Sequence, residues 1–267
     1  MDTRTDTVDL AHARDVAEAA ARAGGAVLAA TDRTQIDVRL KDERVDLTTS
    51  ADAAAQDAAV TAIRAAFGEH TIVGEEGTVA GTDTRHVWYV DGLDGTSNFA
   101  HGLPWYCVSV GLRVDGVATA GAVHDPVHDE LFAAARGLGA TCNGRPLRVG
   151  GPEEIRRAVV ATQVQTSDAE RIRRFTRELE ALMNACGGVR FMGAPALLLS
   201  HVAAGHLTAY VEREMPPWDI TAGQLILTEA GGRITDLDGT DVDTDRVVDV
   251  VATNGRVHDA LLAAFPR

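Results

Sequence analysis

Two aspartates three positions apart, Asp91 and Asp94, are the feature that most constrains this chain. They follow His86–Val90, an apolar segment typical of a buried strand, and stand in the run D-G-L-D-G-T-S. Carboxylates at this spacing around a glycine turn can hold one hard cation between them. Such oxygen ligands favour Mg2+, Mn2+ or Ca2+ over zinc. We therefore expect the buried strand to end at a divalent-metal site.

The residues after this pair, Gly95 and Thr96, are typical of the first turn of a helix. Unpaired backbone N–H groups and the helix dipole favour a bound anion there. The alternative is purely structural, because Asp, Gly and Thr are also ordinary turn and cap residues. The rest of the chain has to decide between a metal-and-anion site and a simple capped turn.

The length and charge of the chain limit its partners. Its 267 residues can form one large domain or two closely packed halves, and its formal net charge is −14. A surface this acidic repels nucleic acid and anionic membranes, so a phosphate-bearing partner needs a local site that carries metal cations. The pattern changes near 150–152, and we expect an N-terminal half, 1–150, with the main metal and phosphate site, and a C-terminal half, 151–267.

Three widely spaced cysteines indicate a reducing compartment. Cys107, Cys142 and Cys186 have no C-x-x-C companion, which favours reduced thiols over a disulfide framework or a zinc site. The first residues lack the apolar core of a signal peptide, and no apolar run is long enough to cross a bilayer. We expect a cytoplasmic protein with no membrane partner.

Periodicity in the first half predicts two helices and several strands. The ranges 8–30, capped by Thr7 or Asp9, and 51–67 have helical spacing, whereas 37–41, 70–74, 105–112, 116–124 and 131–135 have strand character. Asp52 falls in the first turn of the second helix, where an acid ordinarily only stabilises the helix dipole. Glu75 follows the strand 70–74, from which it could reach a cation held by Asp91.

The second half alternates strands and helices, which indicates an α/β arrangement. The ranges predicted are 157–162, 189–191 and 207–211 as strands, and 167–185, 195–204 and 218–230 as helices. Asp219 lies at the start of the last helix, a position that suits either capping or metal binding.

Two other acidic segments resemble metal sites only superficially. His124–Glu130 contains two histidines and three acids, but its Asp-Pro step favours a connection between strands. Asp236–Asp245 is rich in aspartate but lacks the glycine and glutamate positions of a calcium loop, so we expect an acidic hairpin turn.

Three ordered motifs together resemble the inositol monophosphatase family of Mg2+-dependent, lithium-sensitive phosphatases. They are G-E-E at 74–76, D-G-L-D-G-T-S-N-F at 91–99 and W-D-I-T-A-G at 218–223. The resemblance covers most of the chain. It implies an α/β fold, a layered α+β sandwich of alternating helices and sheets in two halves, and a homodimer.

The resemblance also implies roles for individual residues. Two or three Mg2+ ions, with Mn2+ as a substitute, would be bound by Glu75, Asp91, the carbonyl of Leu93, Asp94 and Asp219. The catalytic group would be Asp52, Thr96 and Glu75, of which Asp52 and the Thr96 hydroxyl help to deprotonate the attacking water. The substrate would be bound by Asp94, Gly95, Thr96, Gly193 and Glu212.

Departures from the family pattern affect the metal turn and the substrate side. Gly92 stands where the family usually has proline, which should leave the metal turn less restrained. At Ala194-Pro195 many members have a small hydroxyl residue followed by alanine, so a hydrogen-bond donor to the alcohol is lost. Glu212, seven residues before Asp219, matches an acid that contacts inositol hydroxyls and supports a polyol.

The resulting expectation is a Mg2+-dependent phosphomonoesterase that uses metal-activated water to hydrolyse a small polyol phosphate such as inositol monophosphate. One alternative keeps this chemistry with another leaving group: adenosine monophosphate or bisphosphate, fructose 1,6-bisphosphate, histidinol phosphate or a biosynthetic intermediate. Another alternative is a metal-binding relative that has lost catalysis. We expect a small phosphorylated metabolite as partner and no nucleic acid polymer.

Overall fold

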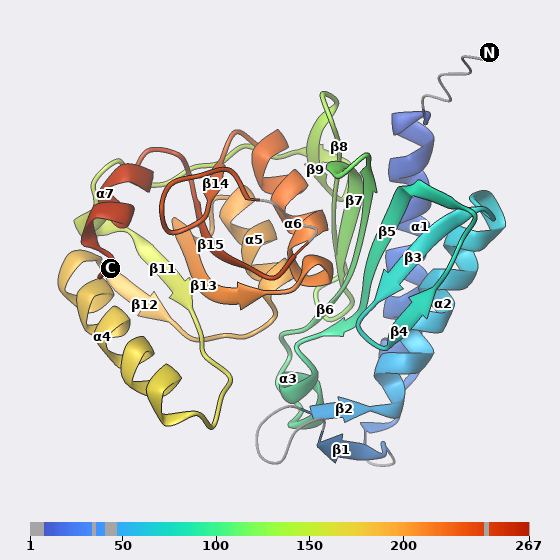
Figure 1. Ribbon diagram of the computed structural model, residues 1–267, viewed down its shortest axis with the longest axis horizontal. Coiled ribbons are helices and arrows are strands. Elements are labelled where there is room, and N and C mark those ends of the chain that lie inside the picture. The colour runs from blue at the N-terminus through green and yellow to red at the C-terminus, as the bar shows by residue number, and fades with distance from the viewer. Residues whose placement is uncertain (1–7, 34–35, 41–46, 243–245, 267) are drawn as a thin grey trace.

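The computed structural model describes residues 8–33, 36–40, 47–242 and 246–266 (Figure 1). Its helices are α1 (Leu10–Ala30), α2 (Ser50–Ala66), α3 (Thr96–Ala100), α4 (Ala169–Ala185), α5 (Pro195–Ala203), α6 (Pro217–Glu229) and α7 (His258–Ala264), with a 3-10 turn at Ile155–Arg157.

The strands form two large sheets and a small ribbon. The ribbon pairs β1 (Val38–Leu40) with β2 (Leu47–Thr49). The eight-stranded sheet has the order β10 (Arg145–Pro146), β9 (Gly139–Cys142), β8 (Glu130–Ala135), β7 (Val117–Asp125), β6 (Cys107–Val114), β5 (Asp83–Asp94), β3 (His70–Gly74), β4 (Gly77–Val79). The five-stranded sheet has the order β12 (Gly188–Arg190), β11 (Val159–Thr162), β13 (Ala209–Met215), β15 (Val248–Thr253), β14 (Arg233–Thr235).

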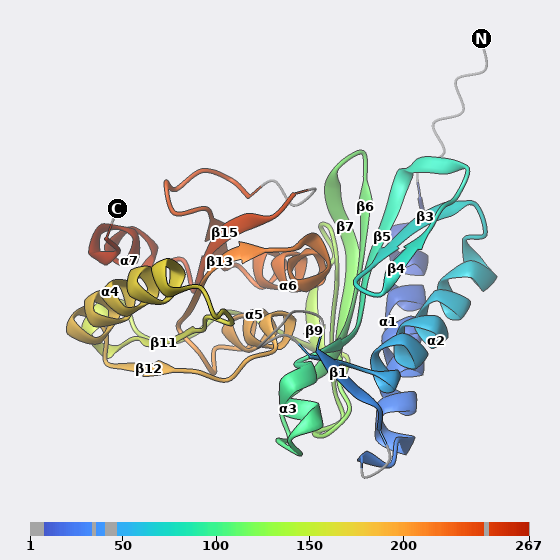
Figure 2. The ribbon, with the colours of Figure 1, turned by 60° about the horizontal axis from the view of Figure 1, so that its bottom comes forward.

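Helices and sheets alternate through the molecule, as Figures 1 and 2 show. Helices α1 and α2 pack on one face of the eight-stranded sheet, and α5 and α6 lie between that sheet and the five-stranded sheet. Helices α4 and α7 cover the outer face of the five-stranded sheet. The predicted layered α/β class is confirmed.

The two sheets share one hydrophobic core around α5 and α6. Phe132 of the first sheet and Tyr210 of the second are both fully buried in the cluster that contains Leu197 and Ile226. A second cluster lies between the first sheet and the helix pair α1 and α2. The division at residue 150 separates the sheets in sequence, but its status as a domain boundary stays a prediction.

Local sequence explains why α1 begins and where it packs. The Asp9 carboxylate caps the helix by accepting hydrogen bonds from the N–H groups of Ala11 and His12, at 3.0 and 3.2 Å. Thr7, the other proposed cap, lies outside the described residues. Gly25 lets α1 touch the sheet, since a β-carbon there would come within 2.2 Å of His124 Nδ1.

Two strands are longer than the sequence indicates, and the difference matters for the site. β5 continues through Asp91 and Asp94 instead of ending at Val90, with a shift of register between these aspartates. β13 continues past Val211 to Met215 and carries Glu212. Of the predicted strand at 37–41, residues 38–40 are a strand and Lys41 lies outside the described residues. No helix in the described part of the chain is long and apolar enough to cross a membrane.

Candidate functional site

Four carboxylates from distant parts of the chain line one cavity of about 450 Å3. Asp91 and Asp94 come from β5, Glu75 follows β3, and Asp219 lies in the first turn of α6. Leu93, Gly95 and Thr96 line the same cavity, as do Gly193 and Glu212 from the second half. The structure therefore gathers all the predicted metal and substrate residues around one space.

Sheet pairing and one helix contact explain why these carboxylates meet. β3 runs parallel to β5 with Gly74 opposite Val90, and the N–H of Glu75 donates to the Val90 carbonyl at 3.2 Å. Glu75 therefore leaves the sheet directly beside Asp91. Ser109 on β6 donates to the carbonyl of Trp218 at 3.0 Å, which fixes the start of α6 and with it Asp219.

The grouping raises the pKa values of these acids. Burial, followed by the charges of Glu75 and Asp219, raises the pKa of Asp91 well above its ordinary value. Burial and the charge of Asp94 do the same to the pKa of Asp219, and burial raises the pKa of Asp94 to about 7. Each shift has the direction expected when like charges crowd together out of water.

The donor set fits hard divalent cations. In the part of the chain that the structure describes, no arginine or lysine forms an ion pair with Asp91, Asp94 or Asp219. A buried group of carboxylates without a cationic side chain needs another source of positive charge. Carboxylate and carbonyl oxygens are the ligands that Mg2+ and Mn2+ prefer.

Protein hydrogen bonds hold the two β5 aspartates in place. Asp91 accepts from the N–H of Leu93 at 2.8 Å, which bends the strand at the register shift. Asp94 accepts from the N–H of Ala196 at 2.7 Å and from Cys107 Sγ at 3.4 Å. The bond to Ala196, at the start of α5, links the first half of the chain to the second across the cavity.

Asp52 is both a helix cap and a neighbour of the site. Its Oδ2 accepts from the N–H and hydroxyl of Thr49, at 2.9 and 2.6 Å, which completes a capping box at α2. Its Oδ1 accepts from the Thr96 hydroxyl at 2.7 Å. The side chain is only 1% exposed, and this burial raises the pKa of Asp52 against the opposing effect of both threonines. The capping and functional interpretations of Asp52 are therefore compatible.

Gly92 serves close packing, and the expectation that its turn is less restrained than one with proline stays a prediction. A β-carbon at Gly92 would lie 2.5 Å from the backbone N of Gln56 and 2.6 Å from the carbonyl oxygen of Asp52. Glycine therefore allows α2 to approach β5, which brings Asp52 within reach of Thr96. Residue 92 therefore has no room for a side chain while α2 keeps this position.

The chain turns at Gly95, where the sequence predicts a phosphate contact. Gly95 precedes α3 with φ of 99°, a left-handed conformation that glycine adopts without strain. Opposite it, the Gly193 carbonyl accepts from Trp105 Nε1 at 2.9 Å, and the preceding carbonyl of Met192 accepts from Asn98 Nδ2 at 2.7 Å. The motif at 91–99 thus also positions the segment that carries Gly193.

Glu212, predicted to bind substrate, lines the cavity and accepts hydrogen bonds from two side chains. Tyr210 donates its hydroxyl proton to Glu212, and Gln163 Nε2 donates at 3.1 Å. Burial raises the pKa of Glu212 to about 8 despite these donors. The carboxyl group therefore tends to hold its proton near neutral pH when no ligand is bound.

Sequence reasoning missed several residues of the cavity. Gln163, Gln165, Arg171 and Glu214 all line it, and Thr49 supports Asp52 from outside it. A capping-box pattern, threonine followed three positions later by aspartate, could have identified Thr49.

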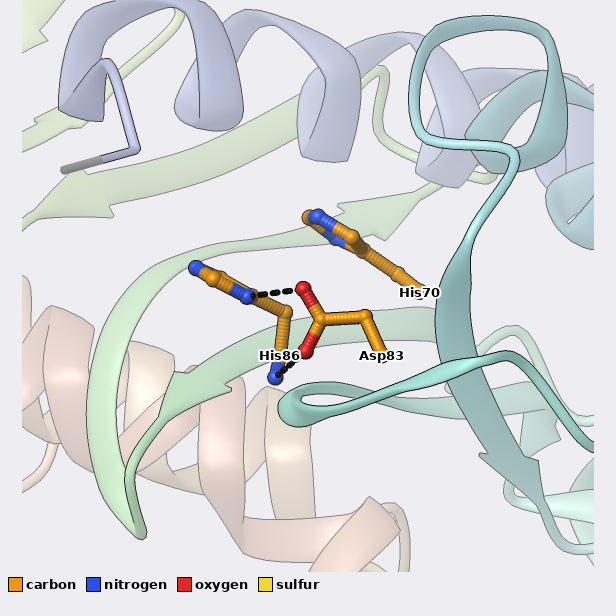
Figure 3. Close-up of side chains that lie close together, drawn as sticks. All are labelled: His70, Asp83 and His86. Atoms are coloured by element: carbon orange, nitrogen blue, oxygen red, sulfur yellow. Dashed lines mark hydrogen bonds and ion pairs between the residues drawn. The ribbon is translucent and has the colours of Figure 1, made fainter. Parts of the chain in front are cut away.

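A histidine cluster on the other side of the sheet is structural. Figure 3 shows His70, Asp83 and His86, whose nitrogen and oxygen atoms lie close enough together to suggest a metal site. His70 Nδ1 already accepts a hydrogen bond from Trp88 Nε1 at 3.0 Å, and His86 Nδ1 is paired with Asp83 at 2.6 Å. The imidazole rings stack at 4.6 Å, so their in-plane lone pairs do not converge.

The segment 124–130 is a connection between strands, as predicted. Asp125 accepts from the N–H groups of Val127 and His128, at 2.8 and 3.1 Å, and contacts His128 Nδ1 at 2.7 Å. In the acidic segment after β14, Asp236 accepts from the N–H groups of Asp238 and Thr240, which forms a turn. Residues 243–245 of that segment lie outside the described ranges.

Comparisons with known proteins agree with this geometry. Residues 9–267 match the family model described as the inositol monophosphatase family. The structure of an inositol monophosphatase from Anabaena is 36% identical, with a TM-score of 0.83 over 97% of this chain and 98% of the other. The Nus factor SuhB of Pasteurella multocida is 38% identical over 84% of this chain and 85% of its own.

A further structure, of an IMPase/NADP phosphatase complexed with Mg2+ and phosphate, is 27% identical. Its TM-score is 0.77, and the similarity covers 86% of each chain. With matches of this extent, this chain belongs to the inositol monophosphatase family.

Proposed function

We propose that this chain is a Mg2+-dependent phosphomonoesterase that hydrolyses a small polyol phosphate such as inositol monophosphate. The observation that carries the proposal is the meeting of Glu75, Asp91, Asp94 and Asp219 at one cavity, next to the bonded pair Asp52 and Thr96. Family membership supports the same activity.

Two or three Mg2+ ions, or Mn2+ in their place, would be held by five groups: Glu75, Asp91, the Leu93 carbonyl, Asp94 and Asp219. The Mg2+ in the related phosphatase supports this choice of metal. Bound Mg2+ supplies Lewis-acid chemistry: it neutralises phosphate charge and lowers the pKa of a coordinated water. Glu75, counted among the catalytic residues, would act as such a ligand.

Asp52 and Thr96 would move the proton of the attacking water. The Thr96 hydroxyl donates to Asp52 Oδ1. The lone pairs of Thr96 Oγ1 can therefore accept a hydrogen bond from a water molecule. Because burial raises the pKa of Asp52, this carboxylate accepts a proton more readily than an exposed aspartate does. Thr49 keeps Asp52 oriented throughout.

The rest of the cavity would bind the substrate. The backbone N–H groups of Gly95 and Thr96 would contact the phosphate, while Asp94, Gly193 and Glu212 would face the alcohol. Gln163 donates to Glu212 at 3.1 Å, and the remaining donors and acceptors of the two side chains suit the hydroxyl groups of a polyol.

Two other functions remain as alternatives. Gln163 and Ala194 in the substrate wall motivate a different alcohol, such as a nucleotide, fructose 1,6-bisphosphate, histidinol phosphate or a biosynthetic intermediate. A regulatory, non-catalytic role is motivated by the relative named Nus factor SuhB. Mg2+ binding without turnover on a broad panel would favour that role.

We also propose a homodimer in the cytoplasm. The dimer is suggested by the family resemblance, and the location is supported by three cysteines that form no disulfide. Measurement of molar mass in solution by light scattering would reveal a monomer if the dimer is wrong.

Phosphate release from a substrate panel tests the proposed activity. The panel holds inositol monophosphates, fructose 1,6-bisphosphate, adenosine 3′,5′-bisphosphate, adenosine monophosphate and histidinol phosphate, each with Mg2+ and with chelator. We expect chelator-sensitive release concentrated on inositol monophosphate. Release from a nucleotide alone would contradict the polyol as substrate. Silence across the panel would leave either a biosynthetic intermediate outside the panel or the non-catalytic relative.

A further inference from the structure

A second, smaller cavity adjoins the candidate site on its substrate side. It has a volume of about 130 Å3, and five residues line both cavities: Gln163, Gln165, Arg171, Glu212 and Glu214. The space available to a ligand therefore continues past the alcohol position towards α4. A substrate longer than a bare polyol phosphate could extend in this direction.

Arg171 and Glu214 line both cavities, and Arg174 lines the smaller one beside them. Arg171 and Arg174, on α4, both form ion pairs with Glu214, Arg174 at 3.0 Å. The group carries one positive charge in excess, although the whole chain has a net charge of −14. Among the described residues, the charged side chains that line the opposite wall of the larger cavity are acids: Glu75, Asp91, Asp94 and Asp219. An elongated anion would therefore orient its free end towards the arginines.

Arg171 and Arg174 form more exposed ion pairs than their neighbour Arg213, which is held by two acids of the fold. Arg213 bonds to Glu178 at 2.6 Å and to Asp249 at 2.7 Å, and its side chain is 24% exposed. Arg171 is 42% exposed and Glu214 41%, and ion pairs this accessible contribute little to stability. A ligand anion can therefore replace Glu214 at small energetic cost.

Two further details favour a ligand at this point. Arg171 Nε is shielded from solvent and donates no hydrogen bond within the described structure. Glu214 has φ of 60°, a conformation that few residues with side chains adopt, and its N–H is tied to Asp249 at 3.0 Å. Unusual backbone of this kind is concentrated at binding sites.

We propose that the leaving alcohol carries a second anionic group, a phosphate or carboxylate, which Arg171 and Arg174 bind in place of Glu214. This inference rests on the proposed phosphatase function and narrows its substrate class. The planar guanidinium of Arg171 can bind either oxyanion through paired N–H groups, its free Nε included. Gln163 and Gln165, between the two ends, would contact the uncharged part of the alcohol.

Matched compounds that differ only in the second anion test the proposal. Inositol 1-phosphate is compared with inositol 1,4-bisphosphate for the phosphate, and glucose 1-phosphate with glucuronic acid 1-phosphate for the carboxylate. The quantity measured is the ratio of kcat/KM within each pair. We expect Arg171→Gln to lower the ratio for the preferred anion about 10-fold or more, and Arg171→Gln with Arg174→Gln to abolish the preference.

Two variants make the test specific. Glu214→Gln removes the competing carboxylate and should raise the ratio several-fold. Arg173→Gln is the matched control, because Arg173 lies on the same helix but pairs with Glu170 at 2.7 Å outside both cavities. It should leave both members of each pair unchanged. An unaltered ratio in the double arginine variant, or the same loss in Arg173→Gln, would overturn the proposal.

A separate readout distinguishes failure of the proposed function. If no compound is hydrolysed, the binding of the same pairs is measured by calorimetric titration in Mg2+. Binding can then be measured directly, because the compounds stay intact in complex with the protein. Tighter binding of the doubly anionic compound that disappears in the double arginine variant would support the second anion site. Equal or undetectable binding of both members would refute it.

Discussion

The two walls of the cavity are built in different ways. The metal wall consists of side chains on β5, after β3 and at the start of α6, with Asp52 of α2 behind it, bonded to Thr96. Asp52, Asp91 and Asp94 are at most 4% exposed. The substrate wall consists of the segment after β11, the first turn of α4 and the end of β13, where Arg171 and Glu214 are about two-fifths exposed. Groups for chemistry lie on packed elements, and groups for recognition lie where the chain can vary without loss of the core.

This difference predicts distinct kinetic effects. Variants of the metal wall should slow every substrate alike, because all share the phosphate. Variants of the substrate wall should change the order of substrates, because they contact only the alcohol.

Asp94→Asn should have the largest effect. The amide keeps the size of Asp94 and can still accept from the Ala196 N–H, but it loses the charge that a cation needs. We expect phosphate release to fall about 100-fold to 1,000-fold on every substrate. Steady-state kinetics with thermal unfolding checks this, and exposed Asp241→Asn is the control. Full activity would contradict a metal-binding role for Asp94 and leave only its structural hydrogen bonds.

Asp52→Asn should have the next largest effect and a distinct pH signature. Because burial raises the pKa of Asp52, activity should fall on the acid side at a pH above the ordinary range of an aspartate, as this base gains a proton. The variant should lose about 100-fold in kcat together with this acid limb. Asp57→Asn, exposed on the same helix, should retain the wild-type profile. If activity in Asp52→Asn still falls at the same acid pH, that fall arises from another group.

The residues that local sequence predicts follow the same division between the two walls. The layered fold and the residues of the metal wall could be found because their residues stand in short ordered motifs, such as 91–99. Gln163, Arg171 and Glu214 stand in no such motif, and their meeting depends on how α4 and β13 pack. The close approach of α2 to Gly92 is likewise a tertiary contact that local sequence does not record.

Gly92→Ala should separate packing from chemistry in the metal wall. Its β-carbon would meet the backbone of Gln56 and Asp52, so α2 must move away from β5. We expect unfolding to become easier by about 1–3 kcal/mol and activity to fall about 10-fold as Asp52 leaves Thr96. Denaturant unfolding and kinetics measure both. Gly137→Ala meets no neighbouring atom but has φ of 75°, so it serves as a control for backbone strain alone. Wild-type stability in Gly92→Ala would contradict the packing role.

With no metal bound, the buried acids of both walls should make the stability of the folded state depend on pH. The folded state holds protons more tightly than the unfolded chain, with pKa values of about 7 for Asp94 and about 8 for Glu212. Their contribution is therefore complete below about pH 4 and is lost as pH rises to about 8. In chelator, the melting temperature should fall by a few degrees over this range, and Mg2+ should restore it at high pH. A melting temperature that rises with pH in chelator would contradict these shifts.

Glu212→Gln should have the smallest effect and tests the substrate wall most directly. With a pKa of about 8, Glu212 is mostly protonated at pH 7 when no ligand is bound, and glutamine imitates that neutral form. Gln163 donates to one carboxyl oxygen of Glu212 and Tyr210 to the other. The amide oxygen of glutamine can keep one of these donors, and its NH2 group can donate to the Tyr210 hydroxyl oxygen. We expect at most about a 3-fold to 10-fold change at pH 7, different for each alcohol, and a larger one above pH 8, where the wild-type group ionises. A uniform loss of 100-fold on all substrates at pH 6 would instead place Glu212 with the metal wall, and the distinction between the walls would fail at this residue.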